Sequence, residues 1–337
     1  MHGFARPMRM GSPSLLWIVP SMGWNEGALA ALWAADALQG SGIRVAVQPL
    51  EVETGPPLLW PRAIERRPPL SQQPRNEWRT LYLNFDCIIV DQNFDTEFHY
   101  VKMARDLART FLFARQPSLP ERLDVSQYAL FDGVLTASRA SYQVLARQPS
   151  LLPSRLVPVP LLVGKTTGAT VSWPFSQVDG PVVAMAGIVD AFQGIEIIVN
   201  ALSVMAARHQ PRSLLVLGDG PDAKRLKAYT RSLGVRAEFA PETLDWREWV
   251  AKADALVTLG FQPGLMGDVE VSALAGTPVL APDIPSIRER ADQLSTVWLE
   301  QPTVMGVIEQ LEQTQWVRGT PKTPNGRIDE WITALRL

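Results

Sequence analysis

Short apolar runs alternate with amphipathic segments from Pro181 to Glu289, and this alternation most restricts what the chain can fold into. The apolar runs are 181–187, 213–221 and 253–260, and a glycine lies at or near the end of each. Strands that alternate with helices are typical of a parallel sheet covered by helices on both faces. Ligands of such sheets bind beyond the carboxyl ends of the strands, so these glycines mark a candidate site.

The N-terminal half repeats the alternation. Strands are expected at 15–20, 43–50, 85–91, 110–115, 131–138 and 156–162, and the first helix stops at Gly40 and Gly42. We therefore predict an α/β protein with two Rossmann-like, doubly wound parallel-sheet domains that face a cleft. The expected parts are a first domain at 1–163, a linker at 164–180, a second domain at 181–320 and a C-terminal helix at 321–337. That helix could cross back to the first domain.

Two segments interrupt this pattern. Residues 53–79 are rich in Pro and Arg and lack a clear period, which favours an irregular insertion beside the cleft, either a lid or an ordered surface loop. The linker contains Gly164-Lys165-Thr166, but a phosphate-binding loop needs a glycine five residues earlier, where the chain has Val159. We therefore reject a phosphate-binding loop there.

Composition excludes several classes of function. The net charge of −2 gives no electrostatic footprint for nucleic acid, and the single cysteine, Cys87, is expected to be a buried small hydrophobe. The apolar run at the N-terminus is too short for a signal peptide or a membrane span. We expect a cytoplasmic protein and leave open peripheral association with the inner face of the membrane.

Several segments, in order and spacing, are similar to motifs of a known family. GIVDAFQGIEIIVNAL (187–202) resembles "G-R-L-x-x-x-K-G-x-x-x-L-i-x-A", and LGDGP (217–221) resembles a "G-x-G-P" strand end. ALAGTPVLAPD (273–283) resembles "E-A-x-A-x-G-x-P-V-i-a", and 20–47 looks like a Gly-rich turn followed by a helix. Nearly the whole chain resembles the two-Rossmann (GT-B) glycosyltransferases, in particular the large retaining family 4.

The resemblance implies a sugar transfer from a nucleotide-sugar donor, with retention, without a metal and without a separate cofactor. The acceptor could be a glycan, a lipid or a small molecule. Backbone N–H groups at glycine turns and helix N-termini can hold the donor diphosphate. The residues that the resemblance assigns to donor or phosphate binding are Gly23, Gly27, Gly187, Gln193, Gly194, Gly218, Gly220, Gly264, Gly267 and Glu270. For each glycine, a plain tight turn is the alternative.

The sequence departs from the family pattern at the positions that are expected to bind the donor. Ile188 and Gln193 stand where the family has Arg and Lys on the diphosphate, and Pro263 and Val271 stand where it has paired glutamates. Glu270, one residue from the second of these, could hold the ribose or simply be an acid at a helix N-terminus.

Other groups could supply the missing chemistry. Asp91 and His99 follow the third strand and are candidates for a catalytic or acceptor-orienting role, with solvated loop side chains as the alternative. Arg115 and Arg139 follow strands of the first domain and are candidate replacement cations, and Lys165 is a further cation in the linker.

These departures leave two functions open. The first is a glycosyltransferase whose catalysis comes from positioning and electrostatic stabilisation of the departing diphosphate. The second is a catalytically degenerate relative that acts as partner or scaffold for an active transferase. A sugar-nucleotide epimerase is disfavoured because it needs acid and base side chains, and the chain has only three histidines.

Overall fold

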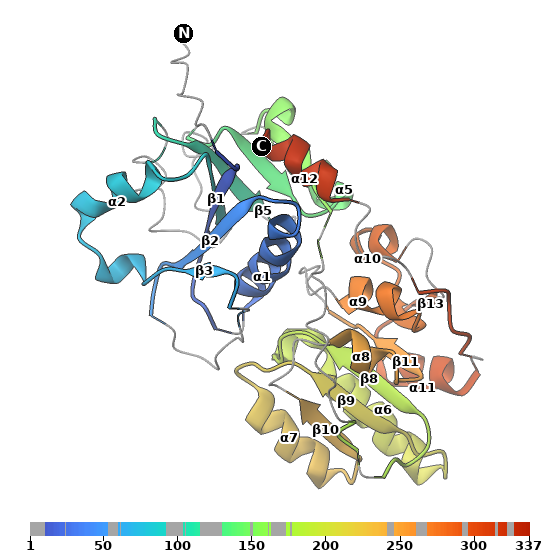
Figure 1. Cartoon of the computed structure of the whole chain (residues 1–337). Helices are drawn as coiled ribbons and strands as arrows, with labels where there is room; N and C mark the ends of the chain where they lie inside the picture. The colour runs from blue at the N-terminus through green and yellow to red at the C-terminus, as the bar shows by residue number, and fades with distance from the viewer. Residues whose placement is uncertain are drawn as a thin grey trace. The chain divides into compact units, whose positions relative to one another are not determined.

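The computed structural model describes residues 11–23, 25–52, 60, 62–91, 104, 106–114, 130–148, 151–160, 162, 173–175, 177–240, 246–260, 268–291, 296–313, 316–321 and 327–337. The side chains of residues 26, 192, 246, 247, 268, 270, 274, 286 and 290 are outside this description. The described residues form two compact units, each built on one sheet (Figure 1).

The first unit has a seven-stranded sheet in the order β3-β2-β1-β4-β5-β6-β7, and the described pairs are all parallel. Its strands are β1 (Ser14–Val19), β2 (Arg44–Pro49), β3 (Glu65–Arg66), β4 (Cys87–Asp91), β5 (Arg109–Ala114), β6 (Gly133–Thr136) and β7 (Leu156–Pro158). Central strands such as β1 are buried along their whole length, and all residues of β1 after Ser14 are apolar, because helices bury both faces of the sheet. Cys87 is fully buried in β4, as predicted.

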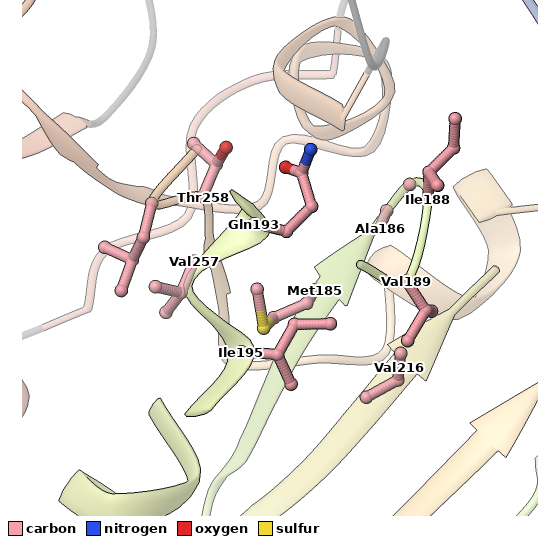
Figure 2. A pocket seen from close by; sticks show the side chains of 11 residues that line it. Met185, Ala186, Ile188, Val189, Gln193, Ile195, Val216, Val257 and Thr258 are labelled. Atoms are coloured by element: carbon pink, nitrogen blue, oxygen red, sulfur yellow. The ribbon is translucent and has the colours of Figure 1, made fainter. Parts of the chain in front are cut away.

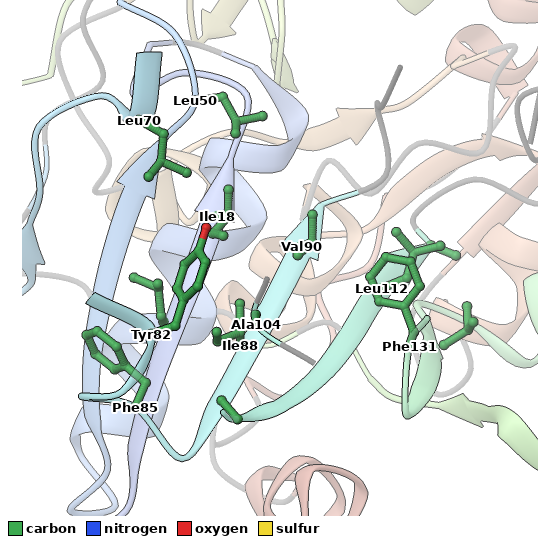
Figure 3. Packing of buried hydrophobic residues seen from close by; sticks show 14 of the residues in the cluster. Ile18, Leu50, Leu70, Tyr82, Phe85, Ile88, Val90, Ala104, Leu112 and Phe131 are labelled. Carbon is green, nitrogen blue, oxygen red and sulfur yellow. The ribbon is translucent and has the colours of Figure 1, made fainter. Parts of the chain in front are cut away.

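One face of this sheet is covered by α2 (Arg75–Tyr82) and α5 (Arg139–Leu145). Leu16 and Ile18 of β1 belong to that core. Figure 3 shows Ile18 there beside Tyr82 of α2, together with side chains of β4 and β5. Helix α5 starts where Ser138 accepts a hydrogen bond from the N–H of Ser141 at 2.9 Å, which is an ordinary N-cap.

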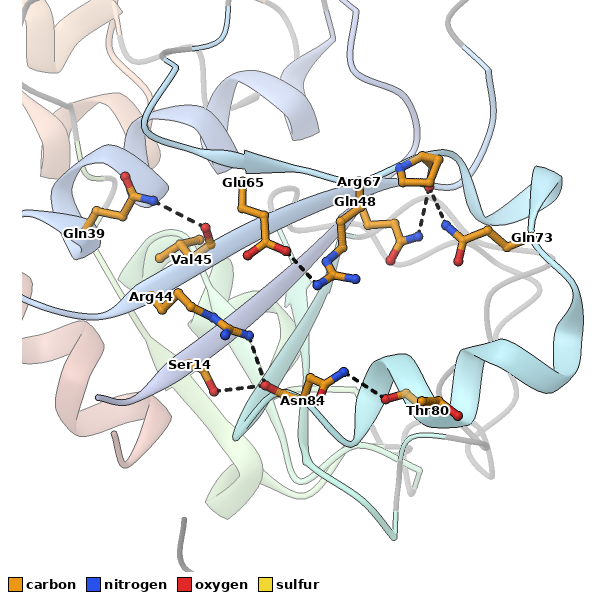
Figure 4. Close-up of polar contacts among 11 residues, drawn as sticks. Ser14, Gln39, Arg44, Val45, Gln48, Glu65, Arg67, Gln73, Thr80 and Asn84 are labelled. Atoms are coloured by element: carbon orange, nitrogen blue, oxygen red, sulfur yellow. Dashed lines mark hydrogen bonds and ion pairs between the residues drawn. The ribbon is translucent and has the colours of Figure 1, made fainter. Parts of the chain in front are cut away.

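The expectation of an irregular insertion at 53–79 is wrong from Glu65 onward. This stretch contains the edge strand β3, a short 3-10 turn at Leu70–Gln72 and the start of α2. The side-chain amides of Gln48 and Gln73 both donate to the carbonyl of Pro68, at 2.9 and 2.8 Å (Figure 4). Pro74 stands immediately before α2. Prolines fix the backbone at turns, and in this segment they obscure the helical spacing of the apolar residues in the sequence.

The opposite face of the first sheet is covered by α1 (Glu26–Gln39) and α12 (Ile328–Leu335). Trp331 of α12 is 0% exposed, and its ring centroid lies 5.5 Å from that of Trp17 and 5.6 Å from that of Phe113. Its indole N–H donates to the carbonyl of Pro160 at 2.6 Å. The C-terminal helix is therefore part of the first unit, although the whole second unit precedes it in the chain.

The second unit has a six-stranded sheet in the order β10-β9-β8-β11-β12-β13, again parallel. Its strands are β8 (Val182–Ala186), β9 (Ser213–Leu217), β10 (Ala237–Ala240), β11 (Ala255–Val257), β12 (Val279–Pro282) and β13 (Thr296–Leu299). Its helices are α6 (Ile195–Ala207), α7 (Ala223–Ser232), α8 (Trp246–Val250), α9 (Asp268–Ala275), α10 (Pro285–Arg290) and α11 (Val304–Gln313). The prediction of two Rossmann-like parallel-sheet units is confirmed.

The core of the second unit lies between its sheet and α6, α7 and α11. Met185 of β8, Val216 of β9 and Val257 of β11 lie in this core together with buried side chains of α6. None of the described helices, in either unit, has the length and apolar content needed to cross a membrane.

Candidate functional site

A hollow lies at the carboxyl edge of the second sheet, beneath the loop that joins β8 to α6 (Figure 2). Its enclosed volume is only about 10 Å³, roughly the room of one water molecule. The residues that line it are Met185, Ala186, Gly187, Ile188, Val189, Gln193, Ile195, Val216, Val257, Thr258 and Leu259. Gln193 and Thr258 bring an amide and a hydroxyl to this otherwise apolar lining. Strand ends below a loop and a helix start are the usual ligand position in this architecture.

The glycines at this edge hold two loops tightly together. The loop that begins at Gly187 lies on the loop 218–222, and the N–H of Val189 donates to the carbonyl of Asp219 at 3.0 Å. A Cβ on Gly218 would lie 1.9 Å from the carbonyl oxygen of Gly187. A Cβ on Gly220 would lie 2.5 Å from the carbonyl oxygen of Val189. Both positions therefore need glycine for packing between the loops.

The N–H groups of these glycines are already engaged. Gly187 donates to the carbonyl of Leu217 at 2.8 Å, and Gly218 donates to the carbonyl of Ala240 at 3.3 Å. Gly220 donates to the carboxylate of the preceding aspartate at 2.7 Å. A phosphate could take these donors only by displacing the bonds that hold the two loops.

The start of α6 does present free donors. Gly194 precedes this helix in a left-handed conformation, with φ 70° and ψ 18°. Within the part of the chain that the structure describes, the N–H groups of Ile195 and Glu196 have no acceptor. Unpaired N–H groups in the first turn of a helix carry a partial positive charge and attract anions.

One cation, Arg225 of α7, is bonded to the first turn of α6. Its guanidinium is ion-paired with Glu196 of α6, and its Nε lies 3.1 Å from the carboxylate of Asp222. The hydrogen bonds with Glu196 and then Asp222 raise the pKa of Arg225 above its ordinary value. Ile188 and Gln193 both line the hollow, but neither side chain is ionisable, so neither supplies charge to it.

The remaining donor-side candidates lie on or before α9. This helix begins at Asp268, and Val271 is buried on it. Glu270 is on its first turn, but its side chain is outside the described atoms. Pro263, Gly264 and Gly267 lie outside the described residues.

In the first unit, the structure places two predicted residues against each other. Asp91 ends β4 and is 0% exposed. Gly27 lies in the first turn of α1, and a Cβ there would be 2.7 Å from Oδ2 of Asp91. Asn25 is the N-cap of helix α1, and its side chain accepts from the N–H of Ala28 at 2.9 Å. The Asp91 carboxylate thus lies at the positive end of α1, where it is stabilised by the helix dipole.

This contact predicts that Gly27→Ala destabilises the protein, although the same change usually stabilises a helix. Alanine is normally better than glycine inside a helix by about 1 kcal/mol. Beside the Asp91 carboxylate, however, Gly27→Ala overpacks the site, and we expect it to lower the free energy of unfolding by about 1–3 kcal/mol. In an Asp91→Ala background, the same change should be neutral or stabilising.

Denaturant unfolding of the four proteins of this cycle measures the coupling between the two positions. An equal effect of Gly27→Ala with and without Asp91 would show that the carboxylate does not set the need for glycine.

The other predicted residues fall into two groups. His99, Arg115 and Lys165 lie outside the described residues. Gly23 is described and buried, and Arg139 is exposed at the first position of α5. Among the described residues, no three His, Cys, Asp or Glu side chains are grouped so as to hold a metal ion.

Two residues of the site were not predicted from the sequence. Thr258 follows β11 and lines the hollow, and Arg225 pairs with the first turn of α6. A polar residue directly after the apolar run 255–257 is the signal that could have indicated Thr258. The position of Arg225 depends on how α6 and α7 pack, which no local pattern encodes.

No protein-family model matches the chain, and no curated protein is similar enough in sequence to be matched. Solved structures do resemble it. A glycosyltransferase from Rickettsia africae matches with a TM-score of 0.65 at 13% identity, over 90% of this chain and 88% of its own. Anabaena HepE, in complex with UDP and glucose, matches with a TM-score of 0.64 at 13% identity, over 96% and 95%.

Sucrose-phosphate synthase from Thermosynechococcus elongatus matches with a TM-score of 0.60 at 15% identity, over 96% of each chain. These identities are low, so the likeness concerns architecture, and it extends over both units. The chain has the two-Rossmann-like fold of the GT-B glycosyltransferases.

Proposed function

We propose that this protein is a glycosyltransferase that moves a sugar from a nucleotide-sugar donor to a glycan, lipid or small-molecule acceptor. One observation carries the proposal: the similarity to sugar transferases extends over nearly the whole of both chains. One of these relatives, Anabaena HepE, has been solved in complex with UDP-glucose. The family 4 resemblance favours a retaining, metal-independent reaction.

The described groups have distinct parts in this proposal. The free N–H groups of Ile195 and Glu196 would face the diphosphate, whose negative charge rises as the sugar leaves. The amide of Gln193 and the hydroxyl of Thr258 would add neutral hydrogen bonds from the hollow. Glu270 is proposed to hold the ribose hydroxyls. Asp91 is buried against α1 and would position that helix.

Calorimetric titration with UDP, GDP and ADP tests the donor site. We expect one of them to bind with a Kd on the order of 10⁻⁵ to 10⁻³ M, because the site lacks the Arg and Lys side chains that bind the diphosphate in the family. Absence of binding for all three would contradict the proposal.

A gain of function provides a sharper test. Gln193→Lys places an ammonium group at the half-buried position beside the start of α6. A charged hydrogen bond contributes about 1.5–3 kcal/mol, so the nucleotide diphosphate should bind roughly 10- to 100-fold more tightly. Gln210→Lys is the matched control, because it adds the same charge at an exposed position after α6 and should leave the Kd unchanged.

The second candidate is a non-catalytic partner or scaffold for an active transferase. The apolar Ile188 and the neutral Gln193 at the loop before α6 favour it. It predicts no transfer or donor hydrolysis by the isolated chain with any common nucleotide sugar, together with a copurifying transferase. Turnover by the isolated chain would exclude it.

A further inference from the structure

Arg225 of α7 is held at two points beside the hollow. Its Nε donates to the carboxylate of Asp222 at 3.1 Å, and its Nη1 is paired with the carboxylate of Glu196. The N–H of Asp222 donates to the carbonyl of Val189 at 3.1 Å, and Val189 lines the hollow. Glu196 directly follows Ile195, which also lines it. The guanidinium therefore lies close to the hollow, between the first turns of α6 and α7.

This position is unfavourable for a cation on its own. Helices α6 and α7 both begin here, and the N-terminus of a helix carries a partial positive charge. The carboxylates of Glu196 and Asp222 offset that charge. The side chains of Arg225 and Glu196 are 51% and 47% exposed, so their pairing contributes little to the stability of the fold. A ligand anion can therefore replace Glu196 without disturbing the packing of the two helices.

Two polar groups at this edge of the sheet lack a partner. An arginine has five N–H donors, and within the described part of the chain Nη2 of Arg225 has no acceptor. Thr258 is only 8% exposed and lines the hollow, and its hydroxyl makes no hydrogen bond to any described residue. Figure 2 shows this hydroxyl and the amide of Gln193 at the same end of the hollow. A buried hydroxyl without a partner is costly, which indicates that a polar ligand completes the site.

We propose that Arg225 binds the diphosphate of the donor and that the carboxylate of Glu196 competes with the phosphate for it. This inference rests on the proposed sugar transfer, and it names the cation that replaces the two missing at Ile188 and Gln193. Asp222 keeps its bond to Nε and anchors the side chain, while Nη1 and Nη2 turn to two phosphate oxygens. The planar fork of a guanidinium suits a phosphate, and the contact strengthens as negative charge rises on the departing diphosphate.

Calorimetric titration of the full chain with UDP, GDP, ADP and inorganic pyrophosphate tests this contact. Arg225→Gln should raise the Kd of the nucleotide that binds by roughly 10-fold, because a charged hydrogen bond is lost. Glu196→Gln should lower it by about 2- to 5-fold, because a competing negative charge leaves the first turn of α6. Pyrophosphate should rank the proteins in the same order, whereas the nucleoside without phosphate should not distinguish them.

A double substitution and a second ion pair provide the controls. In an Arg225→Gln background, Glu196→Gln should bring a smaller gain, because no guanidinium remains to be released. Arg208, at the opposite end of α6, forms an exposed pair with Glu312 at 3.3 Å in the same unit. Arg208→Gln and Glu312→Gln should therefore leave every Kd unchanged. Thermal denaturation checks that each variant folds, as expected for exposed pairs.

The outcomes separate this inference from the proposed function. If the unsubstituted chain binds a nucleotide and Arg225→Gln binds it equally well, Arg225 is not the diphosphate cation and the donor site stands without it. Weaker binding by Glu196→Gln, or an equal loss in Arg208→Gln, would also overturn the competition. If neither the unsubstituted chain nor Glu196→Gln binds any nucleotide or pyrophosphate, the proposed donor site is wrong, and this inference is wrong with it.

Discussion

Replacing Trp331 by alanine is expected to lower the free energy of unfolding of the first unit by about 3–5 kcal/mol. The indole is fully buried, packs on Trp17 and Phe113, and donates to the carbonyl of Pro160. Its removal leaves a cavity between α12 and the sheet and an unpaired carbonyl. For a unit of this size, the melting temperature should fall by roughly 6–20 °C.

Differential scanning calorimetry measures the shift, and hydrogen exchange of peptides from β1 and β5 assigns it to the first unit. Trp331→Phe should cost less, about 1–2 kcal/mol, because an aromatic ring still packs there while the hydrogen bond is lost. Glu330→Ala, on the same helix but exposed, should be nearly neutral. A Trp331→Ala protein that melts with the control, or whose second unit alone loses protection, would contradict this account.

Gly218→Ala should be the most damaging single change at the candidate site. Gly218 has a φ of 137°, and the added Cβ would lie 1.9 Å from the carbonyl oxygen of Gly187. Backbone strain and overpacking together should cost roughly 2–6 kcal/mol and separate the two loops. We expect nucleotide binding to fall below detection, because the loop displaced by the Cβ also leads to the start of α6.

Gly234→Ala is the matched control. Gly234 also has a positive φ, of 68°, but a Cβ there would meet nothing within 4 Å. It should therefore cost only about 1 kcal/mol, from the left-handed conformation alone, and leave nucleotide binding intact. Thermal denaturation and calorimetric titration compare the two variants. Equal losses would show that conformation, and not contact between the loops, requires the glycine at 218.

The sheet cores were predictable from sequence because parallel strands buried on both faces are continuous apolar runs. Leu15–Val19 and Leu214–Leu217 show this plainly, and both lie in central strands. Helix α2 was not predicted. It has a short apolar face, Trp78, Leu81 and Tyr82, and follows a run of prolines, so tertiary packing on the sheet decides its formation.

The candidate site was less predictable because its geometry depends on distant residues. The sequence indicated Gly27 and Asp91 separately, but their contact depends on the register that places Trp17 beside Ile89. Likewise, the glycines at 187 and 218 were expected to leave N–H groups for a phosphate, whereas those groups bond to neighbouring carbonyls. Which donors remain free is decided by the pairing of two loops, and no local pattern reports that pairing.

The place of α12 also has a consequence for how the protein is made. Trp17 and Phe113 leave the ribosome early, but the indole that covers them emerges only after the whole second unit has been synthesised. At 5–20 residues per second, the delay between Phe113 and Trp331 is roughly 10–45 s. During that interval a bare aromatic surface on the nascent first unit is open to chaperones and to contact with neighbouring chains, and the second unit can complete its own core first.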